Sequence, residues 1–368
     1  AEGYLKEGRL KEAAEKFNEA FSTRQGSAIG EASLIKLGYI EMRLRDYGGM
    51  DSTIERLSRT YPGSNLANGF IVEAGKWLKD LKPVTAAKYF EKASINAGDA
   101  KDARALAVAA VTLYEKNGEY EKAEEALKGY LSRSKATGRD EAEIRLRIAG
   151  VQVKANKKEA VETLAGIISQ RGRIDDSVVG RATLMLLSTN AREYLDIKLT
   201  QPFDETFDKK TRSLNNFLKG YSEAAKFKIP ELLPEIYLQM GALFENFRDS
   251  IVKSERPNGL TKEQLDEYNF LLEEKAYPYD EQAVKAYERC ADAVRKQTLY
   301  DEWSARCFAR LADIRPALYK RPFEEKWMEP VFITPEPVTL DVEQWDLLMF
   351  PSDIIPRGLR RGGSWRYY

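Results

Sequence analysis

A single helical pattern recurs five times in the N-terminal half of this 368-residue chain. Each copy has a leading residue, a large apolar residue four positions later and a third packing residue three positions after that. The spacings between leading residues are 37, 36, 37 and 37 positions, and these residues are Ala13, Met50, Ala86, Ala123 and Ala160. Offsets of four and three keep side chains on one face of a helix. A repeat of this length predicts a stack of helices that bury this face against their neighbours.

Turn-forming residues separate the helices of this pattern. Asn117 and Gly118 follow an amphipathic stretch and stop it just before the fourth copy, and Gly8 lies at the same place before the first copy. Pro62 and Gly63 end the second copy, because neither residue readily continues a helix. Each repeat is therefore expected to hold two helices joined by a short turn, with the recurring pattern in the second helix.

This arrangement resembles the tetratricopeptide-repeat (TPR) family. The shared features are paired antiparallel helices, Gly or Asn between them, a small residue opening the second helix and a large apolar residue one turn later. The resemblance covers about residues 1–170, with a period slightly longer than the roughly 34 residues typical of the family. Met50 departs from it, because a small residue is expected there. The resemblance implies an all-α fold, a TPR-like α-solenoid of antiparallel helix pairs, which binds protein or peptide partners in a concave groove.

The regular period fades after residue 170, although the sequence stays helical. Residues 171–329 are interpreted as a degenerate TPR-like helical region, and a separate helical domain is the alternative. Three long amphipathic helices are expected there, at residues 177–197, 211–227 and 231–255. Thr261 and Gln264 have the spacing of a capping box that starts a further helix. Another copy of the pattern begins at Ala283.

The C-terminal segment differs in composition from the rest. Recurring prolines exclude a long helix, so residues 330–368 are expected to form an extended tail. The tail carries an apolar cluster made of Trp345, Leu347, Leu348, Met349 and Phe350. Two interpretations are open: the cluster covers the last helices as a cap, or it anchors a partner. We favour the cap, because a terminal repeat needs a cover to stay in solution.

Composition excludes several classes of function. Lys plus Arg and Asp plus Glu each total 58, and this balance disfavours nucleic-acid binding, which needs a basic excess. The chain has no histidine, the commonest general base and metal ligand, and no phosphate-binding loop or nucleophile motif. Two cysteines are too few for a disulfide framework or a four-ligand zinc site. We therefore expect no enzyme activity, cofactor or metal, and no stretch is apolar enough to span a membrane.

Basic residues recur at one place in the repeat, seven positions before the leading residue. They are Lys6, Arg43, Lys79 and Lys116. The first helix of each pair lines the concave surface of such a stack, so these residues predict a basic ladder for an acidic partner segment. Val153 interrupts the series in the fifth copy. Further groove candidates are Tyr39, Met42, Thr112, Glu115, Arg145 and Gln152. The competing interpretation is an ordinary solvated helix face.

We interpret the chain as a protein-interaction scaffold or adaptor. TPR chains with long degenerate C-terminal halves resemble bacterial envelope, secretion or motility assembly proteins, so we favour a bacterial periplasm or envelope, with the cytoplasm as the alternative. The chain begins inside a helical pattern, so an export signal or further repeats are expected to have preceded it. Two other functions stay open: a structural subunit that self-associates through its tail, and a helical enzyme subunit with a site in residues 177–320.

Overall fold

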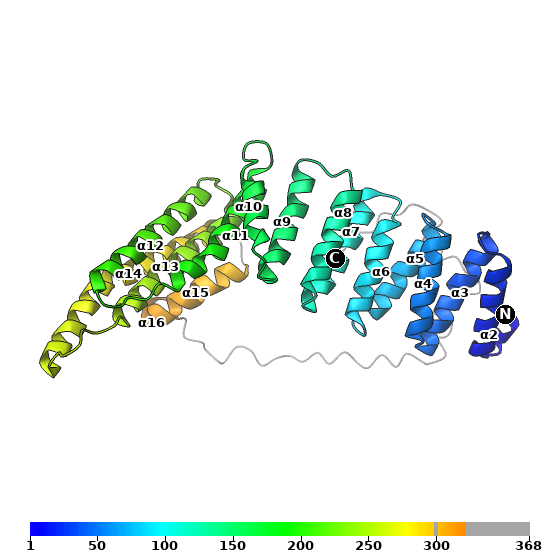
Figure 1. Cartoon of the computed structure of the whole chain (residues 1–368), viewed down its shortest axis with the longest axis horizontal. Coiled ribbons are helices and arrows are strands. Elements are labelled where there is room, and N and C mark those ends of the chain that lie inside the picture. Colours follow the sequence, from blue (N-terminus) through cyan, green and yellow to red (C-terminus); the bar gives the residue numbers. More distant parts are fainter. Residues whose placement is uncertain (298–300, 321–368) are drawn as a thin grey trace. The chain divides into compact units, whose positions relative to one another are not determined.

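Helices follow one another along the chain in a computed structural model that describes residues 1–297 and 301–320 (Figure 1). No β-strand occurs in these residues, which contain one isolated bridge between Arg171 and Ile174. Residues 1–319 form a single packed unit. The predicted all-α class is therefore confirmed. The expected tail at 330–368, with its cluster from Trp345 to Phe350, lies outside the described residues and stays a prediction.

The first ten helices form five pairs. The pairs are α1 (Glu2–Lys6) with α2 (Leu10–Thr23), α3 (Ala28–Leu44) with α4 (Tyr47–Thr60), α5 (Asn65–Leu78) with α6 (Pro83–Ile95), α7 (Ala100–Lys116) with α8 (Tyr120–Arg133), and α9 (Arg139–Lys154) with α10 (Glu159–Ile168). Turns of two to four residues join the two helices of each pair, which consequently run antiparallel. All five copies of the recurring pattern fall in the even-numbered helices, as their spacing predicted.

Local side-chain chemistry explains where these helices begin and end. Each N-cap side chain at the start of α3, α5, α7 and α11 (Asp176–Leu195) accepts a hydrogen bond from a backbone N–H of the first turn, which otherwise lacks a partner. These N-cap residues are Ser27, Ser64, Asp99 and Asp175. Gly118 has a φ of +74° before α8, a conformation that glycine adopts without strain. The predicted stop at Asn117 and Gly118 is confirmed.

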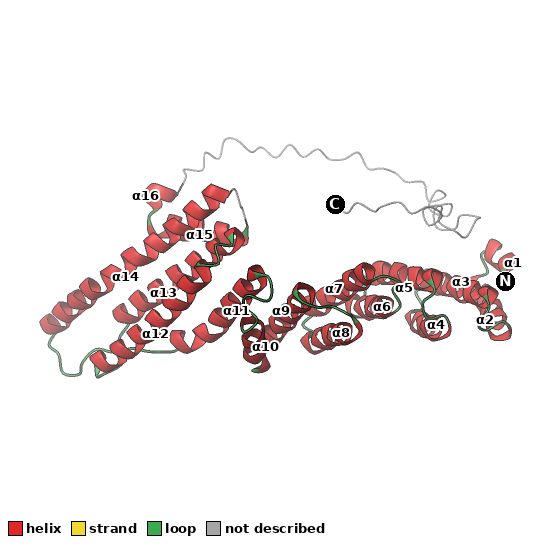
Figure 2. Cartoon of the chain, turned by 90° about the horizontal axis from the view of Figure 1, so that it is seen from above, coloured by secondary structure: helices red, strands yellow, loops and turns green. Residues whose placement is uncertain are grey.

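Among the described residues, four helices of 20 residues or more follow the five pairs, and two shorter ones come after them (Figure 2). They are α11, α12 (Phe203–Ala225), α13 (Leu233–Val252), α14 (Lys262–Gln297), α15 (Glu302–Ile314) and α16 (Pro316–Tyr319), with the 3-10 turn η1 (Pro230–Leu232) before α13. The helix expected at 211–227 begins instead at Phe203, directly after Pro202. Asp204 and Glu205 lie in its first turn, where negative charge is favourable because of the helix dipole, so they mark the observed start.

The capping box predicted at Thr261 and Gln264 is confirmed. The backbone N–H of Thr261 donates to the Gln264 side chain at 2.9 Å, and the backbone N–H of Gln264 donates to the Thr261 hydroxyl at 3.3 Å. The helix that follows, α14, continues through Pro278 and includes the pattern that begins at Ala283. Proline has no backbone N–H, so the Glu274 carbonyl lacks its usual partner in the helix. Pro278 is solvent-exposed, so this carbonyl lies on the solvent-facing side of the helix.

The core passes from helix to helix through overlapping apolar clusters. One cluster runs from α2 to α9, the next joins α9 to α11, another joins α11 to α14, and the last joins α13, α14 and α15. All five leading residues of the recurring pattern are fully buried. Burial shared between neighbours is the expected organisation of a repeat protein. The domain boundaries expected after residues 170 and 329 stay predictions.

One disulfide joins α14 to α15. Cys290 of α14 and Cys307 of α15 are both fully buried, and their Cα atoms are 6.3 Å apart. The carbonyl oxygen of Pro234, at the start of α13, lies 3.4 Å from the Cys290 sulfur. The cross-link therefore lies where α13, α14 and α15 pack together.

Candidate functional site

Polar bridges join successive odd-numbered helices at sequence separations close to one repeat. These bridges pair Lys36 with Glu2, Ser64 with Glu31, Tyr39 with Glu73 (2.5 Å), Arg104 with Asp140 (2.9 Å) and Glu143 (2.5 Å), and Arg147 with Glu115 (2.7 Å). A second row joins even-numbered helices. It pairs Arg56 with Asn18 (2.8 Å), Tyr89 with Asp51 (2.6 Å) and Lys92 with Glu55 (2.6 Å). The polar groups of these side chains are engaged in contacts that hold neighbouring repeats together.

A cleft of about 650 Å³ opens where the third, fourth and fifth helix pairs adjoin. One wall is the turn from α6 to α7, and the other is the end of α8 with the turn into α9. The Ser94 hydroxyl donates to the Ala103 carbonyl at 2.7 Å, which fixes α6 against α7. Tyr130 and Ile144, both buried, supply an apolar lining. The volume falls in the range of pockets that bind ligands.

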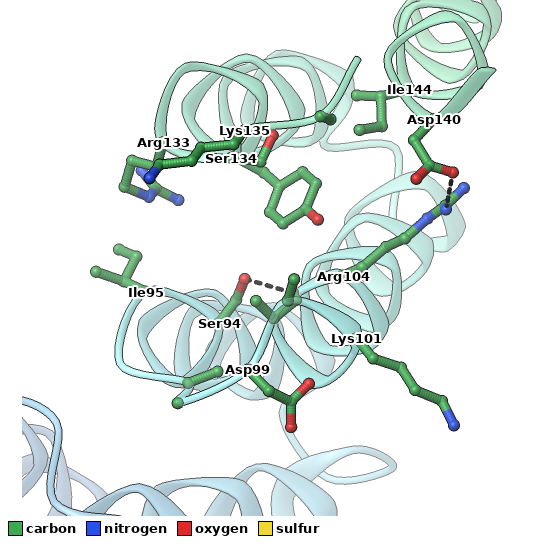
Figure 3. A pocket seen from close by; sticks show the side chains of 16 residues that line it. Ser94, Ile95, Asp99, Lys101, Arg104, Arg133, Ser134, Lys135, Asp140 and Ile144 are labelled. Carbon is green, nitrogen blue, oxygen red and sulfur yellow. Dashed lines mark hydrogen bonds and ion pairs between the residues drawn. The ribbon is translucent and has the colours of Figure 1, made fainter. Parts of the chain in front are cut away.

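Arg104 closes one side of this cleft (Figure 3). Its Nη1 lies 2.9 Å from Asp140 Oδ1 and its Nη2 lies 2.5 Å from Glu143 Oε2, so the guanidinium joins α7 to α9 through two hydrogen bonds. Ile95 and Arg133 lie on the opposite side in Figure 3. Ile95 is half exposed, which leaves an apolar side chain at the rim.

The lining charges that remain unpaired are all positive. Lys101, Arg133 and Lys135 are exposed, and none of them forms an ion pair with a residue that the structure describes. The two acidic residues of the lining are already engaged: Asp99 caps α7, and Asp140 binds the arginine that closes the cleft. Three available cations beside an apolar surface suit an acidic ligand that also carries apolar groups.

The four residues of the expected basic ladder lie at corresponding ends of odd-numbered helices. Lys6 and Lys116 are the last residues of α1 and α7, Arg43 lies in the last turn of α3, and Lys79 is the C-cap of α5. All four are exposed. The turns that follow differ in length, so Arg43 lies one residue before the helix end and Lys79 one residue after it, whereas Lys6 and Lys116 lie at it. Each such step rotates the side chain by about 100° around the helix axis. Their alignment in one row stays a prediction.

Three other groove candidates take part in contacts between repeats. The Tyr39 hydroxyl donates to Glu73 of α5, and burial with this hydrogen bond raises the pKa of Tyr39. Thr112 and Glu115 of α7 both accept hydrogen bonds from Arg147 of α9, at 3.4 and 2.7 Å. These contacts join helices of neighbouring pairs. Any role of Tyr39, Thr112 and Glu115 in partner binding stays a prediction.

Gln152 does not face a groove. It is 3% exposed, its amide nitrogen donates to Glu124 of α8 at 2.8 Å, and its amide oxygen accepts from Thr163 of α10 at 2.9 Å. An amide bonded at both ends inside the protein is not available to a partner, so this assignment is wrong. Met42 is half-buried against the core. Arg145 is exposed and pairs with a glutamate one turn earlier on α9 at 2.7 Å.

Two buried glutamates have opposite electrostatic surroundings. Burial alone would raise the pKa of Glu124, but hydrogen bonds from Lys128, Lys157 and Gln152 outweigh it and hold the pKa at about 2. Burial raises the pKa of Glu41 to about 7, because only Thr53 donates to its carboxyl group, at 3.1 Å. The second oxygen of Glu41 has no hydrogen-bond partner among the described residues. Glu124 is therefore ionised and Glu41 is partly protonated near neutral pH.

Lys210 lies in the region considered for an enzyme site, but its contacts are with backbone carbonyl groups. It is fully buried, and its Nζ donates to the carbonyl oxygens of Tyr194 (3.3 Å) and Ile197 (2.8 Å) at the end of α11. Burial lowers the pKa of Lys210 to about 8. A cleft of about 430 Å³ nearby is lined by Lys209 and Arg212 but not by Lys210.

The described residues contain no acidic or cysteine cluster suited to a metal ion. No helix among them is long and apolar enough to cross a membrane.

Sequence reasoning missed the residues of the cleft. Arg104 and its partners Asp140 and Glu143 carried a usable signal, because opposite charges 36 and 39 residues apart lie about one repeat apart. Arg133 and Lys135 carried no such signal. Their position beside α7 depends on the conformation of the turn into α9, which residue spacing does not specify.

Stacked antiparallel pairs, cores shared between neighbours and bridges at one-repeat separation define this chain as an all-α helical-repeat protein with solenoid-like packing. No family model and no curated protein matches the sequence. Among solved structures, the chain is similar to a "Circular tandem repeat protein with novel repeat topology and enhanced subunit contact surfaces". The two share 14% identity over 85% of this chain and 68% of that chain, with a TM-score of 0.26. At this TM-score the similarity says nothing about this chain, and its class follows from its own helices and their packing.

Proposed function

We propose that this chain is a non-catalytic scaffold of the TPR type, which binds an acidic segment of a partner protein between its helix pairs. The observation that carries the proposal is the cleft beside α7, where Lys101, Arg133 and Lys135 are available over an apolar lining. Helical-repeat proteins commonly bind extended segments along their stacked helices. Acidic side chains of a partner would pair with the three cations, and an apolar side chain would contact Ile95.

Charge reversal at matched positions tests this proposal. The probe is a fluorescein-labelled peptide of Glu, Leu and Tyr, titrated with the full chain while anisotropy is recorded. Arg133→Glu with Lys135→Glu changes the cleft, and Arg43→Glu with Lys79→Glu changes the ladder by the same net charge. We expect the cleft variant to bind about tenfold more weakly or worse, and binding to weaken as salt screens the charges.

A third variant controls for the loss of net charge. Lys11→Glu with Lys219→Glu reverses two exposed lysines far from the cleft in sequence. Equal weakening by the cleft and control variants would mean that the peptide responds only to total charge, and the proposed site would be wrong. Weakening by the ladder variant alone would move the site to the C-terminal ends of the odd-numbered helices, in agreement with the groove expected from sequence.

The biological setting is part of the same proposal. An envelope or periplasmic scaffold is favoured over a cytoplasmic one by the disulfide between Cys290 and Cys307, because such bonds persist in oxidising compartments. Assembly through the C-terminal tail is the second role that the sequence suggested. Sedimentation of the full chain and of a chain ending at residue 329, over a range of concentrations, tests that role.

A further inference from the structure

One face of α14 differs from the rest of the described surface. It carries Phe270, Leu271 and Tyr277, whose exposed fractions are 66%, 54% and 63%. No other helix in residues 1–297 and 301–320 has three large apolar side chains that are this exposed. The opposite side of the same stretch is buried against neighbouring helices through Leu272 and Ala276. Clustered exposed apolar groups commonly mark an interaction surface.

Acidic residues surround these apolar side chains. They are Glu263, Asp266, Glu267, Glu273 and Glu274. At about 100° per residue, all five lie within about 60° of Phe270 around the helix axis. All five are exposed, and none of them pairs with a cation in the part of the chain that the structure describes. The face therefore combines apolar contacts with uncompensated negative charge.

The backbone adds an acceptor to this face. Pro278 lies inside α14 and is exposed, and it has no N–H to donate to the carbonyl of Glu274 one turn earlier. A carbonyl without its intrahelical partner remains able to accept a hydrogen bond from outside the helix. Lysine and arginine side chains are donors only, so they match both this carbonyl and the carboxylates around it.

We propose that this face of α14, over residues 263–278, binds a basic amphipathic segment of a partner protein. Apolar side chains of the partner contact Phe270 and Tyr277, and its lysines and arginines pair with the surrounding carboxylates. A second copy of this chain that packed through the same face of α14 would present the same negative charge and be repelled. Phosphate-bearing surfaces are disfavoured for the same reason. This surface is opposite in charge to the cleft beside α7, so one chain would hold two chemically different partners.

Two variants separate the apolar and the charged contribution. The probe is a labelled amphipathic peptide of Lys, Arg, Leu and Trp, and the comparison peptide has Glu in place of Lys and Arg. Phe270→Ser with Tyr277→Ser removes the apolar contacts, and Glu273→Gln with Glu274→Gln removes two charges. We expect each variant of the full chain to bind the basic peptide about tenfold more weakly, because a few central residues dominate an interface. The Glu-containing peptide should not bind this face.

Matched controls lie on other helices. Ile29 and Leu66 are exposed to 58% and 54%, so changing both to Ser removes similar apolar surface elsewhere. Glu159→Gln with Glu162→Gln removes two exposed charges from α10. Equal loss of binding in test and control variants would overturn the proposal, as would unchanged binding in both test variants. Concentration-dependent dimers that Phe270→Ser with Tyr277→Ser abolishes would also overturn it, since a second copy would then be the occupant. Binding of the acidic peptide to these variants reports on the cleft independently.

Discussion

The ring of Phe70 in α5 lies directly against the backbone of Gly38 in α3. A Cβ atom placed on Gly38 would come within 2.2 Å of Phe70 Cζ and 2.6 Å of Cε1. Tyr39 packs edge-on against the same ring, with the two ring centroids 4.9 Å apart. The first helices of the second and third pairs therefore meet through a glycine, and the aromatic ring fills the space that any side chain at position 38 would need.

Gly38→Ala should destabilise the protein, although alanine normally favours a helix over glycine by about 1 kcal/mol. The added methyl group collides with a buried ring, and overpacking of this kind costs about 1–3 kcal/mol. Gly69→Ala in α5 is the matched control, because a Cβ there meets nothing within 4 Å. Thermal unfolding should show a lower midpoint for Gly38→Ala and a higher one for Gly69→Ala. Shifts of the same sign would contradict this account.

Glu41 should make stability fall as pH rises between about 4.5 and 7. Its pKa is raised from 4.5 to about 7 in the folded chain, so the folded state holds a proton that the unfolded state releases. Stability linked to this proton is complete below pH 4.5 and lost as pH passes 7. Glu41→Gln keeps the shape of the side chain without its charge. At pH 8 the free energy of unfolding of this variant should therefore be about 1–3 kcal/mol higher than that of the natural chain. Glu159→Gln, which removes an exposed carboxylate instead, is the control.

Glu124 should act in the opposite direction. Its folded pKa of about 2 lies below the usual 4.5, so the stability it contributes is present above pH 4.5 and disappears as pH falls towards 2. Glu124→Gln leaves the two lysines without their carboxylate and should cost about 1–3 kcal/mol at neutral pH. Acid titration followed by circular dichroism should show the variant and the natural chain converging near pH 2. Glu125→Gln, at the exposed neighbouring position, is the control and should cost much less stability at neutral pH.

Reduction of the disulfide should lower the unfolding temperature of the helices around it. Cys290 and Cys307 are separated by 17 positions, and closing a loop of this length stabilises a fold by about 3 kcal/mol. The natural chain should therefore unfold at a lower temperature after a reductant has opened the bond. Cys290→Ala with Cys307→Ala should show that lower temperature with or without reductant. An unchanged midpoint, once thiol titration shows two free cysteines, would mean that helix packing alone holds α15 in place.

The helix pairs were predictable because their causes are local in sequence. The spacing of Ala123, Leu127 and Tyr130 specifies one buried face of α8, and Gly118 specifies the turn before it. The course of α14 through Pro278 was harder to predict, because an exposed proline is tolerated where a buried one would not be. Whether a given position is exposed depends on neighbours that are distant in sequence.

The candidate sites were less predictable than the fold, for the same reason. The place of Gln152 in the repeat predicts a groove residue, yet Gln152 is buried and its amide nitrogen donates to Glu124, 28 positions earlier in the chain. The cleft requires two turns from different repeats to lie opposite each other. Residue spacing within one repeat predicts which face of a helix is buried, but it does not predict a cleft formed between two repeats.

Every bridge described between the first five pairs reaches the next repeat and stops there. Such a chain has no seam that must close on itself, so the number of repeats is not fixed by the fold. A unit of about 37 residues added or lost between matching junctions would leave the remaining contacts intact. The distance between the cleft beside α7 and the apolar face of α14 is then set by how many helices stand between them. Whole repeats could lengthen or shorten that spacing without any change to either surface.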